Sequence, residues 1–353
     1  MKKQFIVSSF YSSSGGMSTF VRSLTEKTNA AAIETYVASN DIPKNLSESD
    51  IKSIRLTSRS NLFTCLHLLA ALLKANPDHI QTHGRWHLNA TVLIYKILSK
   101  LIPGQTNTSI YVIKHTDITE SRKKATFFRI IDSGFDKIFF PSFFFMNKCI
   151  SELGYPKERC DVAYPGVPEL PIPLEQINLK EIKENKKIIT YVGKFVFPRK
   201  VEGLLSLIDG FAEALKSRSD LYLLIVGDGP LQDIVEKKIA EAQIHDCNYR
   251  ILGGVKNARQ IYEESDLHCH ISFSETFGLV VLEALSLNKN VIINAISDFY
   301  RFKEIPQLHI IEPTKQEISK KIIELIDLPP EETIIAIEGF FSWTKTAKKL
   351  GAY

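Results

Sequence analysis

The sequence predicts an α/β protein made of two doubly wound domains, each a parallel sheet with helices on both faces. The first observation is the length of 353 residues, which favours two cores rather than one. The second is that short apolar runs of strand length alternate with helical runs in both halves. The third is a proline-containing, then charged, segment at 168–187, which we interpret as an interdomain linker. Alternating strands and helices imply parallel sheets buried on both faces.

The first half, residues 1–167, begins with a strand at 5–7, a loop containing Gly15 and Gly16, and a helix from 18 to 24. Glycines in such a loop let backbone amides approach a phosphate. The remaining elements predicted in this half are a helix at 61–75, strands at 78–84, 109–114 and 136–142, a helix at 147–153 and a turn at 162–167. His83 and His115 lie at strand ends, the edge where open α/β sheets bind ligands.

The second half, residues 188–340, repeats this alternation. We predict strands at 188–193, 222–226, 249–252 and 267–273, helices at 201–216 and 231–243, and a basic loop at 194–200. Residues 272–285 (SFSETFGLVVLEAL) carry two glutamates, Glu275 and Glu283, around a Phe-Gly pair. They predict a strand, a tight loop and then a helix from Gly278, because Leu, Glu and Ala favour helices. The free N–H groups of a helix start form an anion site, whereas two glutamates alone would also suit a solvated helix face.

Taken whole, this string resembles the signature of retaining glycosyltransferases of the GT-B fold, of the family 4 type (glycosyl transferases group 1). The resemblance implies two Rossmann-like domains that face each other across a cleft. Residues 1–167 would form the acceptor side and 188–340 the nucleotide-sugar donor side. Residues 341–353, which begin FSW, would carry a last helix that crosses back to the N-terminal domain. It also implies a hexosyltransferase (EC 2.4) that retains anomeric configuration, needs no metal, and acts in bacterial surface polysaccharide, lipopolysaccharide or glycoconjugate synthesis.

The resemblance also implies roles for individual residues. Glu275 would contact donor sugar hydroxyls, Glu283 would hold the ribose, and His115 would lie by the donor sugar and acceptor. Cations would stabilise the charge that develops on the departing diphosphate. The donor-binding candidates are Gly16, Lys194, Arg199, Lys200, Gly229, Val255, Phe277, Gly278, Leu279 and Glu283.

Two departures from the family pattern leave the donor sugar open. Residues 288–291 (NKNV) form a turn without its usual glycine and proline, although Asn tolerates left-handed φ. Residues 297–300 (SDFY) replace a glycine loop. We expect no cofactor and a nucleotide-sugar substrate, a UDP-sugar rather than a GDP-sugar, with a glycan or lipid-linked acceptor. The alternatives are a noncatalytic GT-B partner subunit and another sugar-nucleotide enzyme such as an epimerase. The run 268–270 (HCH) is not expected to bind metal, because alternate strand residues point to opposite faces.

Composition and charge bear on partners. Five scattered cysteines favour a reducing cytosol, and no apolar run reaches the ~18 residues of a membrane span. Residues 51–150 hold 14 Lys and Arg but 5 Asp and Glu. The cluster at 121–129, with the apolar run 143–146, suits either an anionic membrane surface or a solvated helix face over a buried Phe cluster. No motif supports nucleic-acid binding. We therefore expect a cytoplasmic protein, peripheral on the inner face of the cell membrane.

Overall fold

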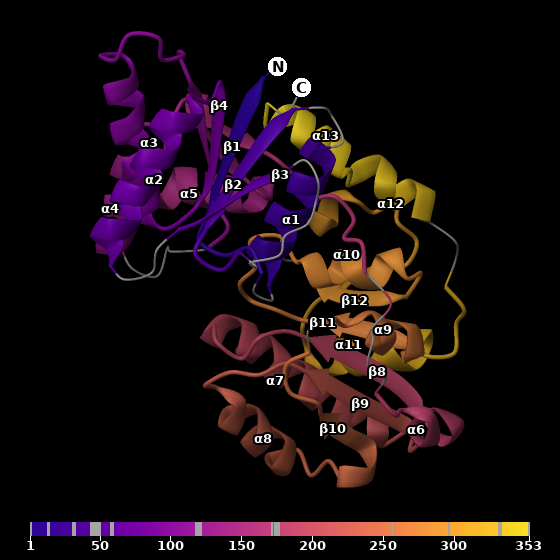
Figure 1. Ribbon diagram of the computed structural model, residues 1–353. Coiled ribbons are helices and arrows are strands. Elements are labelled where there is room, and N and C mark those ends of the chain that lie inside the picture. Colours follow the sequence, from indigo (N-terminus) through magenta and orange to yellow (C-terminus); the bar gives the residue numbers. More distant parts are fainter. Residues whose placement is uncertain are drawn as a thin grey trace. The chain divides into compact units, whose positions relative to one another are not determined.

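The structure is a computed structural model, and it describes residues 2–12, 15–29, 33–42, 51–56, 60–116, 122–170, 172, 177–255, 257–295, 297–330 and 334–351. The chain divides into two compact units. The first comprises residues 1–166 and 341–353, and the second comprises residues 167–340. Each is a parallel sheet with helices on both faces, so the predicted α/β class with two Rossmann-like domains is confirmed (Figure 1).

The first unit contains a sheet of strand order β3-β2-β1-β4-β5-β6-β7 in which every pairing is parallel. Its strands are β1 (Lys3–Ser8), β2 (Glu34–Ser39), β3 (Ile51–Arg55), β4 (His79–His83), β5 (Ser109–Ile113), β6 (Lys137–Phe140) and β7 (Cys160–Val162). Its helices are α1 (Gly16–Asn29), α2 (Asn61–Ala75), α3 (Trp86–Ser99), α4 (Arg122–Asp132), α5 (Phe143–Leu153), the short η1 (Lys157–Arg159) and α13 (Trp343–Lys349). The order reverses between β1 and β4, and ligands of open α/β sheets bind at such a switch point.

The C-terminal helix α13 packs in the first unit beside α1 (Figure 1). The ring of Trp343 lies 5.1 Å from that of Phe20 on α1, and a Cβ placed on Gly166 would collide with Trp343. The side chain of Gln81 donates a 2.7 Å hydrogen bond to the Leu350 carbonyl at the end of the helix. The last residues of the chain therefore complete the apolar packing of the first unit.

The second unit has the strand order β10-β9-β8-β11-β12-β13, again entirely parallel. Its strands are β8 (Lys187–Val192), β9 (Leu221–Val226), β10 (Tyr249–Ile251), β11 (Leu267–His270), β12 (Val291–Asn294) and β13 (Leu308–Ile311). Its helices are α6 (Lys180–Asn185), α7 (Pro198–Leu215), α8 (Gln232–Glu241), η2 (Asp246–Asn248), α9 (Arg259–Glu264), α10 (Leu279–Ser286), η3 (Ser297–Arg301), α11 (Lys315–Leu325) and α12 (Ile334–Phe340). Its switch point lies between β8 and β11.

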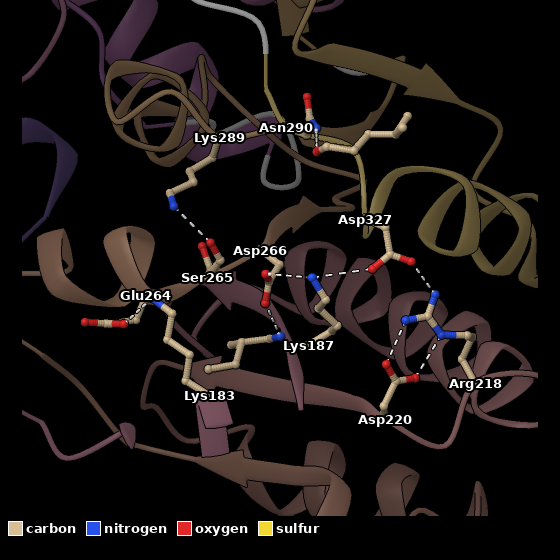
Figure 2. A network of polar contacts seen from close by, with 12 residues as sticks. Lys183, Lys187, Arg218, Asp220, Glu264, Ser265, Asp266, Lys289, Asn290 and Asp327 are labelled. Carbon is tan, nitrogen blue, oxygen red and sulfur yellow. Dashed lines mark hydrogen bonds and ion pairs between the residues drawn. The ribbon is translucent and has the colours of Figure 1, made fainter. Parts of the chain in front are cut away.

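The amino edge of the second sheet is tied together by ion pairs (Figure 2). Arg218 binds both Asp220 and Asp327, and Lys187 lies near Asp327 and Asp266. These residues stand at or just before the first residues of β8, β9 and β11, or shortly after α11. Because each of these five charges has a partner of opposite sign within the network, the ion pairs hold the starts of the strands together.

Several element boundaries differ from those predicted. Helix α7 begins at Pro198 rather than at 201, since proline suits the first helical position and Arg199 and Lys200 continue the turn. Helix α5 begins at Phe143 because Ser142 caps the Phe145 amide, so the apolar run 143–146 is helical. Asn288 adopts a φ of 56°, as its left-handed tolerance predicts. The predicted basic cluster at 121–129 lies partly outside the described residues.

Candidate active site

Three loops meet at the carboxyl edge of the second sheet, after β8, β9 and β10. The Phe195 amide donates to the Asp228 carbonyl at 2.8 Å, and the Leu231 amide donates to the Phe195 carbonyl at 3.0 Å. A Cβ on Gly229 would lie 2.5 Å from that same Phe195 carbonyl, so only glycine permits this approach. Gly229 and the half-buried Val255, both predicted donor-binding residues, thus belong to neighbouring loops of one rigid edge.

The fourth loop of this edge joins β11 to α10 and carries the motif. Gly278 caps α10 with a φ of 103°, a conformation that side chains rarely adopt, and the helix starts at Leu279 as predicted. Phe277 is buried, and its ring lies 5.1 Å from that of Phe299 on η3. The replaced segment 297–300 therefore packs directly against the Phe-Gly pair of the motif.

Glu275 lies buried in this loop and is held through one oxygen. Its Oε1 is 2.8 Å from Nζ of Lys200 on α7 and 3.0 Å from Nε2 of His270 at the end of β11. Helix α7 can come this close because Gly203 lies where a Cβ would collide with the Ile271 carbonyl. Burial alone would raise the pKa of Glu275, but the Lys200 charge and the His270 hydrogen bond outweigh it and lower the pKa to about 2. Glu275 is therefore ionised at neutral pH.

Glu283 lies on α10, the helix that follows this loop, and has a different environment. It is half-buried on α10, and Oη of Tyr262 on α9 donates a 3.1 Å hydrogen bond to its Oε2. Burial raises the pKa of Glu283 above its usual value, and the hydroxyl of Tyr262 offsets only part of that rise. The two glutamates of the motif are thus perturbed in opposite directions.

The predicted diphosphate-binding cations do not share one environment. Lys200, with its side chain 29% exposed, contacts Glu275. Arg199 is exposed, forms a 3.0 Å ion pair with Glu202 and lies over the ring of Phe273. Lys194 is exposed in the loop after β8. The structure thus brings Lys200, rather than its neighbour Arg199, to the motif carboxylate.

The argument from strand alternation about 268–270 was wrong for the two histidines. His268 and His270 are two residues apart, so they share a face of β11, and their rings stack with centroids 6.4 Å apart. They take different partners, because Nδ1 of His268 lies 3.1 Å from the Thr190 hydroxyl while His270 contacts Glu275. Within the described parts of the chain, no three His, Cys, Asp or Glu residues are grouped as metal ligands. The sequence analysis did not identify His270 as a partner of Glu275.

The site candidates of the first unit lie at its own switch point. Gly16 is the first residue of α1, after β1, and His83 and His115 follow at the ends of β4 and β5. Nδ1 of His83 lies 2.8 Å from Nε2 of His115, and Phe20 packs on both rings. Burial, with a smaller effect of the Lys114 charge, lowers the pKa of His115 to about 3, and burial lowers that of His83 well below its usual range. The pair is therefore uncharged at neutral pH.

The fold identifies the structural class of the protein. The chain is similar over its whole length to solved GT-B structures, at identities that speak for the fold alone. A glycosyltransferase from Rickettsia africae ESF-5 has a TM-score of 0.75 and 18% identity, with 99% of this chain and 96% of that chain covered. HepE from Anabaena, solved in complex with UDP, has a TM-score of 0.72 and 16% identity, with coverages of 99% and 98%. The fold is GT-B.

The family comparison concerns the second unit. Residues 175–339 match the model of the glycosyl transferases group 1 family. Among curated relatives, N-acetyl-alpha-D-glucosaminyl L-malate synthase of Bacillus anthracis is 33% identical over 105 residues, which are 30% of this chain and 26% of the relative. Alpha-monoglucosyldiacylglycerol synthase of Acholeplasma laidlawii is 29% identical over 132 residues, 37% and 33% of the two lengths. The chain thus matches about a quarter to a third of each relative's length.

Proposed function

We propose that this protein is a glycosyltransferase that moves a sugar from a nucleotide-sugar donor to a hydroxyl of a glycan or lipid-linked acceptor. The observation that carries the proposal is the motif loop. An ionised, buried Glu275 stands five residues after the end of β11, and Glu283 follows on α10, in the part of the chain that matches the family. A buried carboxylate held through one oxygen is suited to accept hydrogen bonds from sugar hydroxyls through the other.

The donor side of the reaction follows from the same edge of the sheet. Glu283 would accept from the ribose hydroxyls, and the loops with Gly229 and Val255 would surround the base. As the bond to the sugar breaks, negative charge collects on the diphosphate, where Lys194, Arg199 and Lys200 would stabilise it. We propose a UDP-sugar as donor because HepE, which shares the fold, has been solved with UDP-glucose. Synthesis of bacterial surface polysaccharide, lipopolysaccharide or glycoconjugate is the role that these chemistries suit.

The stereochemical course proposed is retention of anomeric configuration without a metal ion. The departing phosphate would act as base toward the acceptor hydroxyl, so its proton leaves with the nucleoside diphosphate while the new glycosidic bond forms. His115 in the first unit is proposed to lie by the donor sugar and acceptor. Because it is uncharged at neutral pH, it would act by hydrogen bonding and not as a fixed positive charge.

The test is a thermal-shift panel of nucleotides and nucleotide sugars, followed by turnover with the donor that stabilises most. A ligand that binds only the folded protein raises its stability by RT ln(1 + [L]/Kd). We expect UDP and a UDP-sugar to stabilise the protein more than uridine does, and transfer to continue in EDTA. Absence of stabilisation by every nucleotide would contradict the proposal, and loss of transfer in EDTA would contradict the metal-independent course.

A membrane-borne acceptor is favoured by one surface of the first unit. Helices α2, α3 and α4 neighbour one another and present exposed apolar side chains, namely Leu62, Phe63, Leu66, Trp86, Ile94, Ile97, Phe127 and Ile130. The acidic residue of these three helices, Asp132, is buried, while Lys74, Lys123 and Lys124 are exposed. These helices thus expose apolar side chains and cations but no carboxylate of their own, a combination that complements an anionic bilayer at about 1 kcal/mol per cation. No helix within the described residues is long and apolar enough to cross a membrane.

This surface can be tested without knowledge of the acceptor. Co-sedimentation with anionic vesicles should be lost in a Lys123→Glu/Lys124→Glu variant and kept in a control that reverses two exposed lysines of the second unit, Lys237→Glu/Lys320→Glu. Neutral vesicles should bind the parent weakly. Binding that ignores both lipid charge and the Lys123/Lys124 substitutions would remove the membrane proposal and leave the transferase proposal standing.

A further inference from the structure

His270 has no role in the proposed reaction, yet it is built into the site. It is the last residue of β11 and is buried, with Nε2 3.0 Å from Oε1 of Glu275. The ring of Tyr191 on β8 is stacked on it, with centroids 5.9 Å apart and planes within 15°. A ring packed on a neighbouring strand in this way cannot turn freely, so His270 meets the carboxylate from a fixed direction.

The position of the imidazole proton follows from the two nitrogens' surroundings. A carboxylate oxygen can only accept a hydrogen bond, so Nε2 must carry a proton to bind Oε1. Nδ1 is buried and has no hydrogen-bond partner among the described residues. A second proton there would leave a buried N–H unpaired, which is costly. The geometry therefore places a single proton on Nε2 of His270.

The contacts on Glu275 are asymmetric. Lys200, from α7, and His270, from β11, both approach Oε1, at 2.8 Å and 3.0 Å. Two donors on one oxygen, from two different elements, fix where the carboxylate points. The second oxygen, which takes part in neither contact, is then available to a ligand.

We infer that His270 is a positioning residue that aims Oε2 of Glu275 at a hydroxyl of the donor sugar, an inference that rests on the proposed function. His270 touches neither substrate nor leaving group and acts only through Glu275. Lys200 supplies charge from a long, flexible side chain, whereas the ring of His270 supplies direction. Loss of His270 should therefore impair the sugar-dependent step more than nucleotide binding.

His268 is the natural control. It lies on the same strand and face, is fully buried, and meets the Thr190 hydroxyl and the ring of Tyr262 but neither glutamate. Its ring also stacks on that of His270, and Tyr262 binds Glu283, so replacing His268 disturbs the packing around both glutamates but removes no hydrogen bond to Glu275. A variant at each position therefore separates positioning from packing.

The kinetic experiment compares His270→Leu, His270→Gln and His268→Leu in the full chain. His270→Leu should lower kcat/KM for the donor sugar by about ten- to a hundredfold, because a hydrogen bond to a charged group is lost. UDP affinity should stay within about twofold. Gln carries an amide nitrogen as many bonds from Cα as Nε2, so it should restore kcat/KM to within about threefold. Equal losses in His270→Leu and His268→Leu, with no rescue by Gln, would overturn the inference.

A second arm needs no donor and so separates this inference from the proposed function. Nitrogen chemical shifts and two-bond couplings of ¹⁵N-histidine-labelled protein report which ring nitrogen of each histidine is protonated, with His270 assigned by its loss in His270→Gln. We expect the proton on Nε2. A proton on Nδ1 alone would overturn the inference, whereas a parent protein inactive with every donor would contradict the proposed function and leave this result to decide the position of the proton.

Discussion

Charged side chains at the two edges of the second sheet have different partners. At the amino edge, Arg218, Asp220, Asp327, Lys187 and Asp266 satisfy one another in partly exposed ion pairs (Figure 2). At the carboxyl edge, Glu275 is buried and held through one oxygen, and Glu283 is held by the Tyr262 hydroxyl, with no cation paired to it among the described residues. At the amino edge these charges are paired with one another, whereas at the carboxyl edge carboxylate oxygens can still accept hydrogen bonds from a ligand. The difference indicates which edge carries function.

The carboxyl edge contains a second contrast, between its two glutamates. The Lys200 charge holds Glu275 ionised, with a pKa of about 2, whereas burial raises the pKa of Glu283. One carboxylate is prepared in advance by the protein. The charged form of the other, Glu283, is disfavoured by burial in the free protein. Hydroxyl donors such as those of a ribose would stabilise it.

The largest effect is expected from Glu275→Gln. An amide cannot form the ion pair with Lys200 and accepts more weakly from a sugar hydroxyl. We expect kcat to fall by about ten- to a hundredfold while UDP affinity is maintained. Initial-rate kinetics with saturating acceptor measure the first, and calorimetric titration measures the second. A variant as active as the parent would break the contrast between the glutamates.

Next comes Glu283→Gln, which should weaken UDP binding by about tenfold through loss of a charged acceptor. Tyr262→Phe is its companion, since that change leaves Glu283 in place without its hydroxyl partner. Direct titration of UDP against both variants is the measurement. If UDP bound Glu283→Gln as tightly as the parent, the ribose role would be excluded.

The two neighbouring cations, Lys200 and Arg199, are expected to differ in their effect on turnover. Lys200→Met removes the ion pair with Glu275, whereas Arg199→Met removes an exposed pair with Glu202 on the same helix turn. We expect Lys200→Met to lower kcat/KM by about tenfold and Arg199→Met to lower it less. Steady-state kinetics on the pair of variants compare them. A larger loss at Arg199 would favour direct contact of that residue with the diphosphate.

Stability should depend on pH with opposite signs for the two glutamates. The folded-state pKa of Glu275 is lowered, so its stabilising effect is present above its ordinary pKa of about 4.3 and is lost as pH falls toward 2. That of Glu283 is raised, so its contribution is full below that value and is lost as pH rises through the folded-state pKa. Relative to parent, Glu283→Gln should gain in Tm between pH 4 and pH 8, and Glu275→Gln should lose. Parallel shifts in thermal melts would contradict this assignment.

The smallest effect should come from the amino edge. Asp327→Asn removes the carboxylate that pairs with Arg218 and Lys187. Asp327 is exposed, so solvent weakens both ion pairs. We expect a loss of stability of about 1 kcal/mol or less and unchanged turnover. Urea unfolding and a rate assay measure these. A marked loss of activity would show that the two edges are not functionally distinct.

The sequence alone was sufficient for the fold class and for the loop and helix of the motif, because alternation and the Phe-Gly pair are local signals. It did not predict β2, β3 or α3. The edge strand β3 reads IKSIR, too short and charged to stand out, and α3 has apolar residues around most of its circumference. The early start of α7 was signalled by Pro198, but the prediction placed a loop at 194–200 and began the helix at 201.

His270 was missed for a different reason. Its partner Glu275 lies five residues away, beyond the end of the strand, and only the loop's path brings the two together. Strand periodicity does place His268 and His270 on one face, yet it cannot say which of them meets a carboxylate. Such pairings depend on backbone geometry within the loop, which residue types specify weakly.

In the proposed mechanism, Glu283 binds the nucleotide and Glu275 binds the sugar. Calorimetric titration of UDP and of the preferred UDP-sugar against the parent, Glu275→Gln and Glu283→Gln tests it most directly. We expect Glu283→Gln to weaken both ligands alike. Glu275→Gln should leave UDP unchanged and abolish the additional affinity that the sugar confers. Equal weakening of UDP by both substitutions, or a sugar increment that survives loss of Glu275, would contradict the claim.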